Sequence, residues 1–257
     1  MVRVGSLTDL VDAGSESKDL TGRTAHQQLS EIYSQTKKLV KRQYALFDNI
    51  LRQAAEEGLR IERYIDLKKS EKDKLYLRFM SDIYPVLTPL AIDNHRPFPL
   101  INNQTIYLAI SIRRGQDKLI SLLQIPAILP RLIPVEVSAK VARYIYLEEL
   151  IEQHLEVIFP NMPIESVSRF RITRNADMEL NEEGAEDLLR LIETSLQQRR
   201  WGQVVRLELV EGYDEKVMKK LIKNLQVKPE QVEEMTDPLD LTFTIGIKGP
   251  EGHKQFQ

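Results

Sequence analysis

The sequence contains no cysteine among its 257 residues. This absence excludes disulfide bonds, zinc sites with thiolate ligands and a cysteine nucleophile, and it suits a reducing cytoplasm. Histidine is also scarce, with four residues at positions 26, 95, 154 and 253. None of them pairs with another at the spacing by which a helix presents two metal ligands. We therefore expect no metal centre in this chain.

Long apolar runs and short catalytic motifs are missing as well. No apolar run approaches the roughly 20 residues that a membrane-spanning helix needs, and an acidic residue interrupts the apolar stretch of "MVRVGSLTDLVDAG", so no signal peptide is apparent. The net charge of -2 gives no electrostatic case for binding nucleic acid. The absence of P-loop, GxGxxG, HExxH, GxSxG and kinase patterns counts against an independent nucleotide-driven enzyme.

The first third of the chain is predicted to be helical after an irregular start. Short apolar pieces in the first twenty residues favour a loop. From Thr24 to Gly58, apolar residues recur every three or four positions, which predicts one helix of about 50 Å at 1.5 Å per residue. A second helix is predicted from Ser70, as its capping residue, to Pro85. Such long elements indicate a helical hairpin or bundle.

The rest of the chain alternates between strand and helix patterns. Residues 105–113 and 119–125 predict a hairpin around "RGQDK". The prolines within 125–135 exclude a helix or a central strand there. Further strands are expected within 142–147, 168–177 and 202–212, and helices within 148–159, from Asn181 to Arg200, and from Asp214 to Leu225. The fold class is therefore α+β: a helical hairpin or bundle, then a head domain whose one mixed sheet carries three helices on one face.

Two groups of basic residues are candidates for binding phosphate or another anion. His95 and Arg96 lie in "YPVLTPLAIDNHRPFPLINN", residues 84–103, where they form either a phosphate-contacting or acid–base cluster or a polar loop tip. Arg169 and Arg171 share one face of a predicted strand, and Arg174 lies on its other face among apolar residues. These arginines form either an anion or interface site or structural salt bridges.

Two aromatic side chains have structural and functional interpretations. Trp201, the only tryptophan, either stacks on a base or a partner chain or anchors the end of a helix. His154 lies on a helix near apolar neighbours, a position more typical of a core histidine than of a ligand.

Several long strings resemble one known family. Residues 84–103 resemble the segment that polyphosphate kinases of the long, multi-domain type carry between their N-terminal helical domain and their head domain. "ITRNADMELNEEGAEDLLRLIETSLQQRRWGQVVRLEL" is similar to the strand–helix–strand of that head domain, and "ILPRLIPV" and "DPLDL" also follow in the family's order. The resemblance extends over nearly the whole chain. It implies a partial N-terminal helical domain at 1–84, a head domain at 85–240 and an irregular tail at 241–257.

The resemblance also implies an activity, cofactors and partners. Such kinases make and reverse polyphosphate from ATP with Mg²⁺, through a phosphorylated histidine in two C-terminal domains that would follow this sequence. None of the four histidines matches that context, so no catalytic or metal-binding residue is assigned, and neither ATP nor Mg²⁺ is expected to be held by this chain alone. The implied partners are a second copy of the chain, as a homodimer or higher oligomer, and, for the full-length enzyme, ATP and polyphosphate.

What remains for this chain is a structural role as a fragment. The resemblance implies that it walls the nucleotide site, mediates dimerisation and is inactive alone, in the cytoplasm, with membrane association of the complex left open. The alternative is a stand-alone binding or oligomerisation module without the catalytic domains. A weaker alternative is a binder of polyphosphate or nucleotide through Arg96, Arg169, Arg171 and Arg174.

Overall fold

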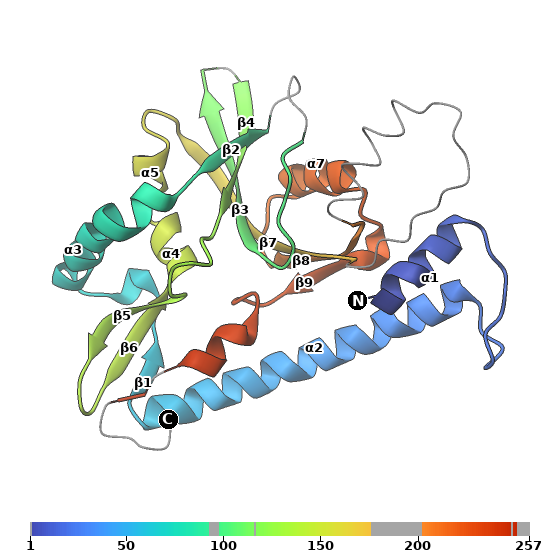
Figure 1. The fold of residues 1–257 in the computed structure, drawn as a ribbon. Coiled ribbons are helices and arrows are strands. Elements are labelled where there is room, and N and C mark those ends of the chain that lie inside the picture. The colour runs from blue at the N-terminus through green and yellow to red at the C-terminus, as the bar shows by residue number, and fades with distance from the viewer. Residues whose placement is uncertain (1, 93–97, 116, 176–201, 248, 251–257) are drawn as a thin grey trace.

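The computed structural model describes residues 2–92, 98–115, 117–175, 202–247 and 249–250. It begins with two helices that lie side by side in opposite directions, α1 (Val2–Asp12) and α2 (Ala25–Glu56) (Figure 1). The loop predicted for the first twenty residues is thus wrong for α1. Leu7 of α1 is buried against Leu29 of α2, and this tertiary contact stabilises a short helix that local sequence alone does not indicate.

The ends of α2 follow local chemistry. The Thr24 hydroxyl accepts the N–H of Gln27 at 3.3 Å, and the Gln27 side chain accepts the N–H of Thr24 at 3.0 Å. This reciprocal pair caps the helix. Gly58 follows the last turn with φ of +86°, a conformation in which glycine avoids the steric penalty of a Cβ atom. Both predicted ends of the long helix are confirmed.

The second predicted helix is composite. It comprises α3 (Lys69–Arg78), a π-helical turn (Phe79–Ile83) and a 3₁₀ turn (Tyr84–Val86) that contains Pro85. The cap predicted at Ser70 is wrong, because Lys68 occupies the N-cap position and its N–H donates to the Glu71 carboxylate at 2.8 Å.

The strands form two mixed sheets, where the sequence predicted one. The six-stranded sheet has the order β2-β4-β3-β7-β8-β9, and only β8 and β9 in it are parallel neighbours. The three-stranded sheet has the order β1-β6-β5, with β1 parallel to β6. The strands are β1 (Leu59–Ile61), β2 (Pro89–Ile92), β3 (Ile106–Arg114), β4 (Asp117–Gln124), β5 (Leu132–Val137), β6 (Ala142–Tyr146), β7 (Ile164–Arg174), β8 (Val204–Val210) and β9 (Val232–Met235).

The strands that sequence periodicity misses are short or carry proline. β1, β2 and β9 contain three or four residues each, too few to show an alternating pattern. Pro134 lies in the edge strand β5, beside an irregularity in its pairing with β6. The prediction that 125–135 holds no central strand is therefore confirmed, and the predicted hairpin of β3 and β4 is confirmed too.

Helices cover both faces of the six-stranded sheet, not the one face that was predicted. Leu108 and Ile110 of β3 face a core that includes α4 (Leu147–Glu152), whereas Tyr107 and Ala109 face a core that includes α7 (Glu215–Leu225). β3 is consequently buried on both sides, which explains its nearly continuous apolar sequence.

The predicted helix 148–159 is divided into α4 and α5 (Leu155–Ile158) at Gln153–His154. Asp214 caps α7 as predicted, by accepting the N–H groups of Lys216 and Val217. The helix predicted from Asn181 and the Trp201 side chain lie outside the described residues. None of the helices that the structure describes is long and apolar enough to cross a membrane.

Candidate functional site

Residues 236–247, the closing segment, follow β9 and run along α2 in the same direction as that helix (Figure 1). Tyr44 of α2 donates a hydrogen bond to the Pro238 carbonyl at 2.6 Å, and the ring of Phe47 meets the ring of Phe243 edge to face at 6.1 Å. Leu239 is buried in the core beneath. The closing segment is thereby held against both α2 and the six-stranded sheet.

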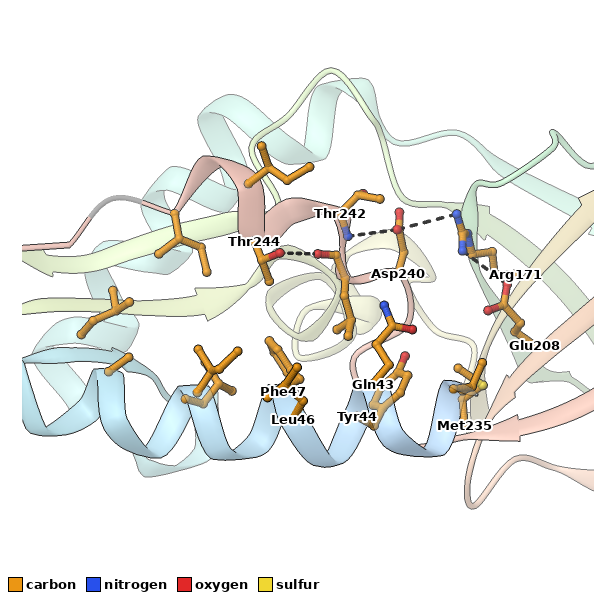
Figure 2. Close-up of a pocket in the computed structure, with 18 of the residues that line it drawn as sticks. Gln43, Tyr44, Leu46, Phe47, Arg171, Glu208, Met235, Asp240, Thr242 and Thr244 are labelled. Atoms are coloured by element: carbon orange, nitrogen blue, oxygen red, sulfur yellow. Dashed lines mark hydrogen bonds and ion pairs between the residues drawn. The ribbon is translucent and has the colours of Figure 1, made fainter. Parts of the chain in front are cut away.

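A groove of about 710 Å³ lies between α2 and the closing segment (Figure 2). Its walls are mostly apolar, with Leu46, Phe47 and Ile50 on α2 and Leu241 and Ile245 on the closing segment. One end is polar. The residues there are Gln43, Tyr44, Arg171, Arg206, Glu208, Asp240 and Thr242.

The floor of the polar end is a ladder of ion pairs from β7, β8 and β9. Glu208, which is buried, lies 3.4 Å from Arg171 and 3.3 Å from Arg206. Arg206 also pairs with Glu233 at 2.7 Å, and Arg171 reaches Asp240 at 3.7 Å. Burial raises the pKa of the Glu208 carboxyl, and the neighbouring guanidinium groups of Arg206 and Arg171 oppose this rise.

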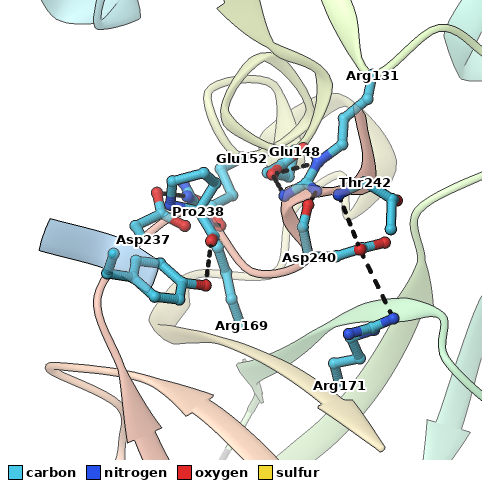
Figure 3. A network of polar contacts seen from close by, with 10 residues as sticks. Arg131, Glu148, Glu152, Arg169, Arg171, Asp237, Pro238, Asp240 and Thr242 are labelled. Atoms are coloured by element: carbon cyan, nitrogen blue, oxygen red, sulfur yellow. Dashed lines mark hydrogen bonds and ion pairs between the residues drawn. The ribbon is translucent and has the colours of Figure 1, made fainter. Parts of the chain in front are cut away.

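A second set of ion pairs anchors the closing segment (Figure 3). Arg131 forms an ion pair with the buried carboxylate of Glu148, at a nitrogen–oxygen distance of 2.6 Å, and donates a hydrogen bond to the Asp240 carbonyl. Its guanidinium also lies 5.0 Å from the centre of the Phe243 ring, within cation–π distance. Three separate contacts of one arginine therefore hold the closing segment against α4.

Tyr44 lies close to charged side chains of both sets of ion pairs, among them Glu208 and Arg131. Burial raises the pKa of its phenol to about 12, and the Glu208 carboxylate adds to the rise. The hydroxyl is therefore protonated at neutral pH and acts as the donor to Pro238.

The structure brings two of the predicted arginines together beneath the closing segment. Arg169 holds Glu152 in a two-pronged contact at 2.5 and 2.7 Å and also pairs with Asp237. Burial alone would lower the pKa of Arg169, but these carboxylates outweigh it and raise the pKa. Arg171 pairs with Glu208 and Asp240 as above. Both arginines thus face carboxylates from within the chain.

Arg174 lies apart, on the other face of β7, as predicted. Its side chain donates to the carbonyls of Ile101 at 3.1 Å and Gly202 at 2.9 Å. Burial lowers its pKa. His95 and Arg96 lie outside the described residues. Anion binding by these five candidates stays a prediction, and titration of the chain with polyphosphate at low ionic strength tests it.

Sequence reasoning missed Tyr44, Arg131, Arg206, Glu208 and Asp240. A usable pattern existed only on β8, where Arg206 and Glu208 are two positions apart and so share a face of the strand. The other three residues come from α2, from a loop and from the closing segment, and only the tertiary fold brings them together.

The carboxylates of this site do not fit a Mg²⁺ site, because each faces a guanidinium group. Within the described parts of the chain, no group of three or more His, Asp or Glu side chains could hold a metal ion. The expectation that this chain alone holds neither ATP nor Mg²⁺ stays a prediction.

Comparison with known proteins connects these elements to one family. Residues 1–62 match the family model of the polyphosphate kinase N-terminal domain, and residues 70–247 match that of the polyphosphate kinase middle domain. The expected boundary between residues 84 and 85 stays a prediction.

Curated relatives agree along the chain. It is 38% identical to a polyphosphate kinase of Halalkalibacterium halodurans over 253 residues, and 39% identical to one of Bacillus anthracis over 256 residues. Each alignment covers 96% of this chain and 36% of the relative, so the chain spans about a third of their length.

The crystal structure of a polyphosphate kinase from Porphyromonas gingivalis has the same fold, with a TM-score of 0.69 and 21% identity. The match covers 88% of this chain and 34% of that one. The chain therefore belongs to the polyphosphate kinase family, of which it carries the N-terminal and middle domains.

Proposed function

We propose that this chain is the N-terminal and middle part of an enzyme that transfers a phosphoryl group reversibly between ATP and polyphosphate. The observation that carries the proposal is the pair of family models, which match in order along the chain. The phosphohistidine intermediate and the Mg²⁺ requirement belong, in this proposal, to domains outside the chain, and the location is the cytoplasm.

Within such an enzyme, the chain forms one wall of the nucleotide site and mediates dimerisation. Phosphoryl transfer needs concentrated positive charge together with a nucleophile or a metal ion. The arginines around the closing segment supply no such surplus, because the carboxylates that they face outnumber them. Arg131, Arg169, Arg171 and Arg206 face Glu148, Glu152, Glu208, Glu233, Asp237 and Asp240. We therefore expect the chain to be inactive by itself.

The test uses ATP labelled in its γ-phosphate, with Mg²⁺ and a polyphosphate primer. The isolated chain is expected to form neither labelled polyphosphate nor a labelled phosphohistidine, whereas a full-length polyphosphate kinase forms both. A chimera, in which this chain replaces the matching domains of that full-length enzyme, is expected to synthesise polyphosphate. Labelled product from the isolated chain would overturn the inactivity, and a folded but inactive chimera would count against the proposed role.

The second candidate is a stand-alone binding or oligomerisation module. The observation that favours it is the exposed apolar surface of α2, where Leu39, Leu46 and Ile50 face solvent. The DNA sequence on either side of the coding region separates the two proposals. A downstream reading frame that encodes catalytic domains supports the kinase, and its absence from the genome supports the module.

A further inference from the structure

We propose that the groove between α2 and the closing segment binds an amphipathic helical segment of a polypeptide that carries one basic side chain. The inference does not depend on the proposed enzymatic function. It rests on the length of the groove, the apolar side chains on its rims and the charge at its polar end.

The length of the groove suits a polypeptide. Along α2, its lining extends from Val40 to Ala54, which is about 21 Å at 1.5 Å per residue. Residues 240–247 of the closing segment line the opposite side. A trough of this length, with a helix as one wall, matches three to four turns of a second helix, and an apolar helix face laid in a groove is a recurring form of peptide recognition.

The rims of the groove expose large apolar side chains on both sides. Ile50 is 51% exposed and Leu46 is 59% exposed on α2, and Ile245 is 91% exposed on the closing segment. Leu46 and Ile50 are four residues apart, so they lie on one face of the helix. Apolar residues gathered on both rims of a groove indicate an interaction surface rather than scattered surface exposure.

The ion-pair network at the polar end of the groove has one more carboxylate than it has guanidinium groups. Arg171 and Arg206 line this end together with Glu208 and Asp240, and the third carboxylate, that of Glu233, pairs with Arg206 but does not line the groove. Figure 2 shows Arg171, Glu208 and Asp240 at the same end of the groove as Gln43 and Tyr44. A lysine or arginine placed at this end would balance the third carboxylate, whereas an acidic or phosphate group would add to the excess. The charge thus selects a basic helix.

The experiment compares two synthetic peptides of fourteen residues. Both have leucines on one face, alanine and glutamine elsewhere, and a lactam bridge on the opposite face that holds the helix. One carries a single lysine in its last turn, and the other carries glutamate there. By titration calorimetry on the whole chain, we expect the lysine peptide to bind at least tenfold more tightly than the glutamate peptide.

Three variants locate the binding. Ile50→Lys places a charge on the rim and is expected to weaken binding of the lysine peptide at least tenfold. Leu39→Lys, at an exposed position of α2 that does not line the groove, is the matched control and should leave binding unchanged. Asp240→Asn should reduce the preference for lysine over glutamate, because it removes one of the three carboxylates.

Several results would overturn the proposal. They are absence of binding by either peptide, equal binding of both, or an equal effect of Ile50→Lys and Leu39→Lys. If sedimentation instead shows a dimer that Ile50→Lys abolishes, while neither peptide binds, then a second copy of the chain covers the groove and the proposed occupant is wrong.

Discussion

The phenol of Tyr44 donates a hydrogen bond to the carbonyl of Pro238 at 2.6 Å, across 194 positions of the sequence. This buried contact joins α2 to the closing segment beside the polar end of the groove. Whatever occupies the groove therefore meets two walls that are fixed to each other.

Replacing Tyr44 with phenylalanine is expected to lower the free energy of unfolding by about 1–3 kcal/mol, because the buried Pro238 carbonyl would lose its donor. Urea denaturation followed by circular dichroism measures the change. Tyr213→Phe is the matched control, since its hydroxyl donates to Glu234 at the surface and its loss should cost less than about 1 kcal/mol. Equal losses in the two variants would contradict the importance of burial.

The Arg131–Glu148 pair is the clearest buried ion pair of the site. Arg131→Met is expected to destabilise the chain by about 3–5 kcal/mol, because the buried Glu148 carboxylate would remain without its partner. Arg23→Met breaks the exposed pair with Glu31 and should cost less than about 1 kcal/mol. The double variant Arg131→Met, Glu148→Gln should recover part of the loss, and no recovery would show that lost packing is the cause.

Gly58 combines a left-handed backbone with a crowded site. A Cβ atom at this position would lie 2.4 Å from the Lys140 carbonyl oxygen, whereas one at Gly14, which also has positive φ, would meet open space. Gly14→Ala should therefore cost about 1 kcal/mol from the backbone alone, and Gly58→Ala clearly more. Thermal and urea denaturation of both variants check the order, and an equal cost would contradict the predicted clash.

His154 should make stability depend on pH. Its ring packs between Tyr76 and Phe79, at centroid distances of 5.2 and 4.8 Å, and burial lowers its pKa. As the pH falls, His154 of the unfolded chain binds a proton at about pH 6.5, whereas His154 of the folded chain does so only at a lower pH. Stability should fall as the pH drops below about 6.5, and less steeply in His154→Gln. Unfolding free energies measured from pH 8 to 5 test this, and parallel curves for both proteins would contradict it.

Local chemistry in the sequence determined where several elements begin and end. Thr24 and Gly58 bound α2, Asp214 caps α7, and β3 and β4 pair as the predicted hairpin. In each case the deciding interaction lies within about four residues, so the pattern can be read without a fold. The family resemblance rests likewise on continuous strings of residues.

Tertiary structure decided what local patterns do not contain. It stabilised α1 through Leu7, divided the strands between two sheets and placed helices on both faces of the larger one. It also paired Arg169 with Glu152, 17 residues away, and with Asp237, 68 residues away. Whether an arginine on a strand forms an internal ion pair depends on which carboxylates the fold brings within about 4 Å of it. Sequence spacing carries no information about such distant partners. The sequence alone therefore determined the family, the α+β class and the ends of the main helices, whereas the groove and its excess of carboxylates exist only in the folded chain.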